Sequence, residues 1–196
     1  MKTYEVKLKS NSPIAFGRYY SPEVPKLDRE SSSDYEVRTW QNRAHVDNDG
    51  KVFLPALSIK NALFSAAKYS GKQIAGQGKK TYSQKMASGV LIVKNVPIAD
   101  KTDIKPLWLH VPSDGMKGGS KRVMKCFPTV EAWEANVEIL VLDEVITKEI
   151  LKEFLIESGN YIGLGSLRVA NGGILGRFSV TAITEVKQEE AMSATA

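Results

Sequence analysis

The chain has 196 residues, of which 42% are hydrophobic and 25% charged, with a net charge of +5 and one cysteine. A single domain with a buried core is the simplest organisation for this length. No apolar run approaches the roughly 20 residues that cross a bilayer, and one cysteine excludes an internal disulfide and a cysteine-rich metal site. We therefore expect a cytoplasmic protein with no membrane segment, and the positive charge favours polyanionic partners.

Hydrophobic periodicity predicts strands and helices in alternation. Strands show apolar residues at every second position, and helices show them at i, i+3, i+4 and i+7. In chain order the predicted elements are a strand at 4–9, a helix from Pro55 to 70–71, short strands at 90–93 and 135–141, a helix after Thr147 and a strand from 178. The order βαββαβ predicts an α+β fold of the ferredoxin-like, RRM type. It would occupy residues 1–186, followed by a flexible tail at 187–196.

Two long insertions interrupt this core. The first, at about 18–50, is polar and contains a predicted strand at 35–40 and an Asp-Gly turn at 49–50. The second, at about 94–128, has a basic, glycine-rich tip between two strand-like arms, which predicts a protruding hairpin. A basic loop is also expected at 71–89, between the first helix and the next strand. Insertions of this length are usually functional or partly disordered.

A glycine-rich stretch joins the last helix to the last strand. Its glycines are Gly163, Gly165, Gly172, Gly173 and Gly176, and two arginines, Arg168 and Arg177, lie among and beside them. Glycine permits positive φ and close backbone approach. Successive N–H groups in such a loop can bind an anion. The alternative is a plain turn that binds no ligand.

Three stretches resemble motifs of the RAMP superfamily, the proteins that build CRISPR effector complexes. Residues 54–63 resemble the start of its first helix, although Asn61 replaces the usual glycine and Phe64 the usual arginine. Residues 12–17 are similar to the end of its first strand. The glycine stretch is similar to its C-terminal glycine-rich loop, in which Arg168 supplies the basic residue. The closest shape is a backbone subunit that lines a guide RNA and has a long hairpin between its second and third strands.

This resemblance implies a non-catalytic scaffold for single-stranded, guide-type RNA, with no cofactor and with other copies of itself or other effector subunits as partners. Cations along the phosphates and aromatic faces for the bases hold such a strand. The candidate nucleic-acid-binding residues are Lys60, Lys68, Lys79, Lys80, Lys117, Lys121, Arg122, Gly163, Gly165, Arg168, Gly173, Gly176 and Arg177. Any single lysine is equally well explained as solvated surface.

Aromatic residues near these cations are the candidates for base stacking. They are Trp40, Tyr82 and Phe127. For Trp40 and Trp108 a small core beneath a long loop is the favoured explanation, and Trp133 is expected in the main core.

Catalysis has weaker support. Some proteins that this chain resembles cut RNA, either with an aspartate before the first helix or with a histidine. The aspartates in that loop are Asp28, Asp34, Asp47 and Asp49, and the only histidines are His45 and His110. No motif selects one of them, and we find no metal-ligand cluster, P-loop, dinucleotide fingerprint or Ser–His–Asp signature. No catalytic residue and no metal is therefore assigned.

Three alternatives stay open. The first is a metal-independent endoribonuclease that uses His45 or an aspartate of the insertion. The second is a single-stranded DNA-binding protein of viral or mobile-element origin, since only a contact to the 2′-hydroxyl separates RNA from DNA. The third is an interaction subunit whose glycine loop packs against another protein.

Overall fold

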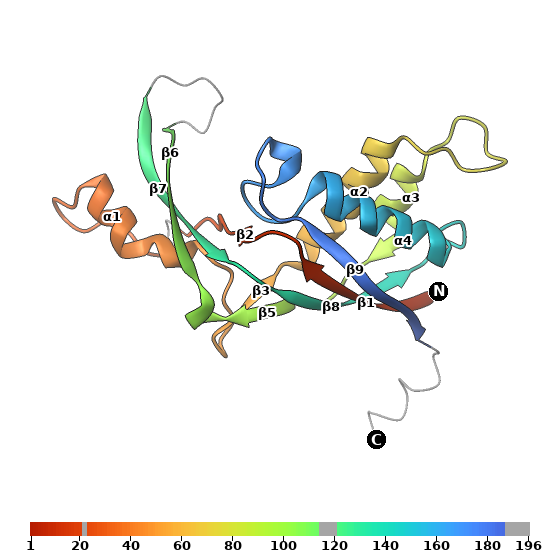
Figure 1. The fold of residues 1–196 in the computed structure, drawn as a ribbon, viewed down its shortest axis with the longest axis horizontal. Coiled ribbons are helices and arrows are strands. Elements are labelled where there is room, and N and C mark those ends of the chain that lie inside the picture. Colours follow the sequence, from red (N-terminus) through yellow and green to blue (C-terminus); the bar gives the residue numbers. More distant parts are fainter. Residues whose placement is uncertain (21–22, 114–120, 187–196) are drawn as a thin grey trace.

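The computed structural model describes residues 1–20, 23–113 and 121–186, which form a mixed α+β fold with antiparallel sheets (Figure 1). Its main sheet has the strand order β4-β8-β1-β9. These strands are β1 (Lys2–Ser10), β4 (Val90–Leu91), β8 (Glu134–Val141) and β9 (Phe178–Val186). β1 pairs antiparallel with β8 on one side and β9 on the other.

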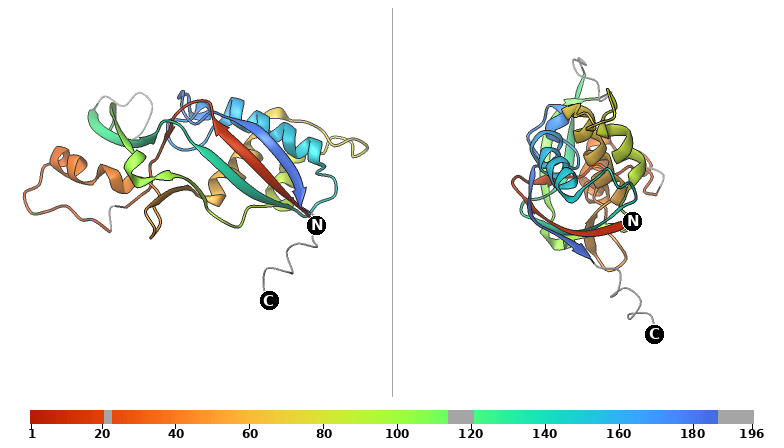
Figure 2. Two further views of the ribbon diagram at one scale, coloured as in Figure 1. Left: turned by 60° about the horizontal axis from the view of Figure 1, so that its bottom comes forward. Right: turned by 90° about the vertical axis from the view of Figure 1, so that its right-hand side faces the viewer.

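Two helices cover one face of this sheet, α2 (Ala56–Ser70) and α4 (Lys148–Glu157), as Figures 1 and 2 show. Their buried faces meet the inward residues of the strands. Tyr4, Val6 and Leu8 of β1 are almost completely buried, as the alternating pattern predicts. Thr147 caps α4 by accepting the backbone N–H of Ile150. The predictions of these strands and both helices are confirmed.

The remaining strands form two smaller sheets. β2 (Ile14–Ala15), β7 (Arg122–Val130) and β6 (Lys105–Pro112) pair in that order, and β3 (Lys51–Leu54) pairs with β5 (Val96–Asp100). β6 and β7 are antiparallel neighbours from Lys105↔Thr129 to Pro112↔Arg122. Residues 94–128 therefore contribute to two different sheets, and the tip of the predicted hairpin lies outside the described residues except for its last positions.

Two predicted local structures are wrong. Residues 35–40 do not form a strand, because α1 (Ser32–Thr39) is a helix whose start is capped by Ser31, which accepts the N–H of Asp34 at 3.1 Å. Residues 71–89 are not one loop, because α3 (Tyr82–Gly89) occupies their second half. Tyr82 and Met86, four positions apart on α3, are both buried against the core, and this packing outweighs the glycine-rich composition.

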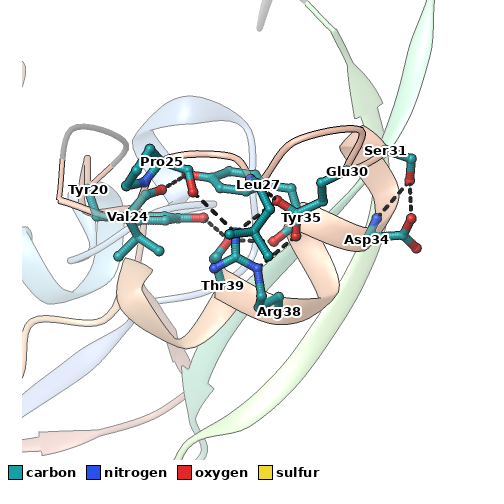
Figure 3. A network of polar contacts seen from close by, with 10 residues as sticks. All are labelled: Tyr20, Val24, Pro25, Leu27, Glu30, Ser31, Asp34, Tyr35, Arg38 and Thr39. Carbon is teal, nitrogen blue, oxygen red and sulfur yellow. Dashed lines mark hydrogen bonds and ion pairs between the residues drawn. The ribbon is translucent and has the colours of Figure 1, made fainter.

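Residues 18–20 and 23–43 are folded upon themselves (Figure 3). Tyr20 and Thr39 share a buried hydroxyl hydrogen bond of 2.6 Å, and Tyr35 donates to the Val24 carbonyl at 2.7 Å. Arg38 binds both carboxylate oxygens of Glu30, at 2.7 and 2.8 Å. Both α1 and the 3-10 helix after it (Trp40–Arg43) pack against β7.

No helix among the described residues combines the length and the apolar character that crossing a membrane requires.

Candidate nucleic-acid-binding groove

The glycine stretch is an ordered loop that packs against the segment between β1 and β2. Gly176 donates its N–H to the Pro13 carbonyl at 2.8 Å, and Ser166 donates to that of Ala15 at 2.7 Å. Within the loop, the N–H groups of Gly163, Leu164, Gly173 and Leu175 also donate to backbone carbonyls. These six N–H groups are therefore not available to a phosphate. An anion nest formed by them, as the sequence suggested, is not present.

Close approach and backbone conformation explain the glycines instead. Gly165 has φ +76° and a Cβ there would lie 2.4 Å from the Ala15 carbonyl oxygen. Gly176 has φ +75° and a Cβ there would lie 1.9 Å from the carbonyl oxygen of Leu164. Neither position can accept a side chain without moving backbone. The glycines thus allow the loop to lie flat against its neighbours, which brings Arg168 to the start of α2.

Two adjoining pockets separate the glycine loop from the first turns of α2, and we call them together the α2 groove. The larger, of about 160 Å³, includes His45, Ser58, Gly165 and Arg168, and the smaller, of about 20 Å³, continues along α2. The smaller pocket is lined by Ser58, Asn61, Ala62, Ser65, Ile162, Gly163, Leu164, Gly165 and Arg168. One wall is therefore the helix and the other is the loop.

Arg168 is the cation of the α2 groove. Its side chain is partly buried and lines both pockets. It makes no ion pair among the described residues, and its buried Nε has no hydrogen-bond partner there. Buried donors are normally satisfied, so an unpaired guanidinium beside a groove is a site for an acceptor-rich ligand. The start of α2 adds partial positive charge to the same place.

His45 lies in the larger pocket as well. Its ring contacts Phe16 edge-on at 6.2 Å and Phe53 at 5.6 Å between centroids. Burial, with a smaller contribution from the positive charge of Arg18, lowers the pKa of His45 below its usual value. The ring is thus neutral at pH 7.

The other candidate residues are dispersed. On α2, Lys68 is exposed and shares the face of Asn61, seven positions earlier, whereas Lys60 is turned away from that face. Arg177 is exposed, and its backbone is held by Ser12. The segments that carry Lys79–Lys80 and Lys121–Arg122 lie at opposite ends of the molecule (Figures 1 and 2). Lys117 lies outside the described residues.

The aromatic residues predicted to stack on bases are buried or partly buried in the structure. Tyr82 is buried and packs on Phe154 at 5.7 Å between ring centroids, so it cannot stack on a base. Trp40 and Phe127 are partly buried, and Trp108 is exposed on β6. Trp133 is in the core, as predicted.

The open face of the main sheet carries Glu5, Lys7, Lys9, Glu134, Asn136, Glu138, Leu140, Ser179, Ala182 and Thr184. No aromatic ring is among these described positions, so base stacking on this sheet face is not supported.

Sequence reasoning missed the polar wall of the α2 groove. Ser58, Asn61 and Ser65 lie at i, i+3 and i+7 on α2, beside the apolar stripe that begins at Ile59. A polar row of this kind next to a buried face is ordinary for a surface helix. Only its position opposite Arg168 gives it significance, and that position depends on the tertiary fold.

The mixed α+β fold is similar to that of proteins whose structures have been solved. It matches a chain in the cryo-EM structure of the Type III-B Cmr-beta complex bound to cognate target RNA, with a TM-score of 0.53 and 13% identity. The match covers 95% of this chain and 61% of that one, so the present chain spans less than two thirds of its neighbour. At 13% identity the match shows a shared fold, which agrees with the resemblance noted in the sequence.

A second solved structure of similar fold is the crystal structure of Cmr6 from Pyrococcus furiosus. It has a TM-score of 0.47 and 13% identity, and the match covers 91% of this chain and 97% of that chain. No family model matches the sequence, and no curated protein matches it.

Proposed function

We propose that the chain is a non-catalytic RNA-binding subunit of a CRISPR-type effector complex, which holds single-stranded, guide-type RNA in the α2 groove. The observation that carries this proposal is Arg168, whose guanidinium lines the groove without an ion pair among the described residues. The fold is that of a chain found in an assembly bound to target RNA, which supports the same function. Other copies of the chain, or other effector subunits, would be its protein partners.

The proposed function includes a finer description of the fold. We interpret β1-α2-β4-β8-α4-β9 as a ferredoxin-like core, one domain at residues 1–186 with insertions at 18–50 and 94–128. The strand order β4-β8-β1-β9, with both helices on one face, supports this description. The second insertion would reach along the RNA with Lys121 and Arg122.

The chemistry of the α2 groove suits a phosphodiester. Arginine presents several N–H donors in a planar fork that matches two phosphate oxygens. The partial charge at the start of α2 favours the same anion. The hydroxyl groups of Ser58 and Ser65 and the amide of Asn61 can bind sugar and phosphate oxygens, which positions a strand without reading its sequence. A scaffold that follows any guide needs binding of this kind.

Binding of short single-stranded RNA by fluorescence anisotropy, across a salt series, tests the function. Arg168→Ala is expected to weaken binding about tenfold, and to lower the slope of log affinity against log salt by about 0.7, the value for one phosphate contact on a single strand. Arg177→Ala is the matched control, because Arg177 is an exposed arginine of the same loop outside the groove.

Each other result has a definite meaning. No binding to RNA, or equal losses for the two arginine variants, contradicts the assignment of the groove. Equal affinity for DNA of the same sequence favours a general single-strand binding protein over an RNA scaffold.

A second candidate function is metal-independent RNA cleavage. The observation in its favour is that His45, neutral at pH 7, lies in the same pocket as Arg168. A neutral imidazole can accept the proton of a 2′-hydroxyl while a guanidinium stabilises the phosphorane charge. Incubating labelled RNA with the protein and a chelator tests this function, because cleavage that is lost in His45→Ala would support it.

A further inference from the structure

Two tyrosines form an exposed stacked pair on the helical side of the protein. The ring centroids of Tyr69 and Tyr161 lie 5.5 Å apart with an angle of 29° between the ring planes. Tyr69 is 68% exposed and Tyr161 is 52% exposed. Aromatic side chains usually bury most of their surface, so a stacked pair with both rings in solvent presents aromatic area for a ligand.

The pair stands at the end of the α2 groove, because each tyrosine continues one of its walls. On the helix wall, Ser58, Ser65 and Tyr69 fall within about 40° of one another around the helix axis, so they form one row. On the loop wall, Tyr161 directly precedes Ile162, which lines the groove. Ser58 and Tyr69 are separated by about 16 Å along the axis, from the rise of 1.5 Å per residue. A short run of nucleotides fits that length.

The charges differ between the two ends of the α2 groove, one at Arg168 and the other at the tyrosine pair. Arg168, which has no ion pair in the described part of the chain, provides the cation at the start of α2, and Lys68 is an exposed cation beside Tyr69. Lys72, farther along, is bound to both oxygens of Glu153, and Glu157 lies near that pair. Phosphate is therefore favoured at the Arg168 end, whereas the tyrosine end offers aromatic surface in nearly neutral surroundings.

We propose that Tyr69 and Tyr161 form a stacking platform for one nucleobase of the single strand whose phosphate is held at Arg168. This inference rests on the proposed function and adds a second contact to it. Of the four residues next to the rings in sequence, Lys68, Ser70 and Asn160 are polar and exposed, and the apolar Ile162 is buried. A stable protein interface buries about 800 Å² on each partner and has an apolar centre, which two rings among polar residues do not supply. A single planar base fits them.

The test uses the full chain and single-stranded RNA that carries the fluorescent base 2-aminopurine at successive positions. Stacking on an aromatic ring quenches this base, so wild type is expected to quench it at one position. The variant Tyr69→Ala with Tyr161→Ala is expected to lose that quenching and to bind RNA about tenfold more weakly, which corresponds to about 1.4 kcal/mol. Its salt slope stays unchanged, because stacking releases no counterions.

The matched control is Tyr69→Phe with Tyr161→Phe, which keeps both rings and should keep both affinity and quenching. An RNA without a base at the quenched position should bind wild type about as weakly as intact RNA binds the alanine variant, with no further loss when the two changes are combined.

The failure of this inference can be told from a failure of the proposed function. If wild type binds RNA and Arg168→Ala lowers the salt slope, but the alanine variant keeps full affinity and quenching, the platform is wrong and the RNA function stands. A phenylalanine variant as weak as the alanine variant also overturns stacking, because the rings are retained. If wild type binds no single-stranded RNA under any salt condition, both proposals are contradicted.

Discussion

Glu36 of α1 accepts the backbone N–H of Cys126, in the middle of β7, at 2.9 Å. Its other carboxylate oxygen accepts a hydrogen bond from Arg43 at 2.9 Å. The side chain of Glu36 is only 8% exposed and that of Arg43 19%. One carboxylate therefore attaches α1 to the sheet formed by β2, β7 and β6 and also binds Arg43, whose buried Nε has no partner among the described residues.

Replacement of Glu36 by alanine should destabilise this attachment. The change leaves a buried N–H and a largely buried guanidinium without their acceptor, at a cost of about 2 to 3 kcal/mol. Urea unfolding measures this loss. Glu131→Ala is the control, because Glu131 pairs with Lys105 at a fully solvated site and its removal should have a negligible effect.

The thiol of Cys126 gives an independent readout of the same change. Burial, aided by the negative charge of Glu36, raises the pKa of this thiol to about 11, and the side chain is inaccessible. Alkylation of wild type under native conditions should be slow, since it needs an exposed thiolate. Faster labelling of Glu36→Ala than of Glu36→Gln, which removes the same charge but keeps an acceptor for the Cys126 N–H, would show that the segment carrying α1 opens. Equal labelling rates would contradict this account.

Acid titration should reveal the ion pair between Glu30 and Arg38. The hydrogen bonds from Arg38 are the main cause that lowers the pKa of Glu30 from 4.5 to about 2. A lowered carboxylate pKa stabilises the fold above pH 4.5, and the contribution is lost as the pH falls from 4.5 through about 2. NMR titration should place the midpoint of Glu30 near 2 in wild type. It should return toward 4.5 in Arg38→Ala, and an unchanged midpoint would exclude the pair in solution.

Much of the core could be predicted from sequence, because local periodicity and burial agree there. Tyr4, Val6 and Leu8 alternate in the chain and are buried in the structure, and Thr147 caps the helix that follows it. The segment around α1 shows the opposite case. The β-prone residues at 35–40 form a helix because the Ser31 cap and the contact of Glu36 with β7 act together. The second of these contacts joins positions far apart in the chain and has no local signal.

The glycine loop can be tested with two glycines of the same backbone conformation. Gly165 and Gly50 have φ of +76° and +77°, but only Gly165 is crowded, since a Cβ there would lie 2.4 Å from the Ala15 carbonyl oxygen. Gly50→Ala should cost about 1 kcal/mol for the left-handed conformation alone. Gly165→Ala should cost about 2 kcal/mol more, because backbone must move. Equal losses of unfolding free energy would show that the loop does not pack as described.

Only part of the candidate site could be predicted from the sequence. Arg168 follows from the glycine pattern, but the pattern also suggested free N–H groups that the structure pairs with Pro13, Ala15 and the loop itself. Tyr82 was chosen for its basic neighbours, yet helix formation buries it. Tyr69 follows the basic Lys68, but Tyr161 has no basic residue next to it, and nothing in the sequence marks the two tyrosines as a pair. Their stacking depends on how the end of α2 meets the turn after α4, which periodicity does not encode.

Substitution of His45 distinguishes a protein that only binds RNA from one that also cleaves it. If the protein only binds RNA, wild type and His45→Ala should leave labelled RNA intact during prolonged incubation in chelator. If it cleaves RNA, the rate should rise with pH as the His45 imidazole is deprotonated, and the midpoint of this rise should lie below the usual imidazole pKa, because burial lowers the pKa of His45. His110→Ala is the control, since His110 is exposed on β6 and does not line the groove.

Asn61 lets the electrostatics of the α2 groove be changed without a change in shape. Asn61→Asp replaces an amide by a carboxylate of the same size on the wall that faces Arg168. The new charge would pair with the guanidinium or repel a phosphate, and either effect should weaken RNA binding about tenfold, most strongly at low salt. Gln84→Glu makes the same chemical change at an exposed position of α3, and it should leave binding nearly unchanged. Similar losses for the two variants would mean that RNA responds to the net charge of the protein, and the α2 groove would no longer be distinguished from the rest of the surface.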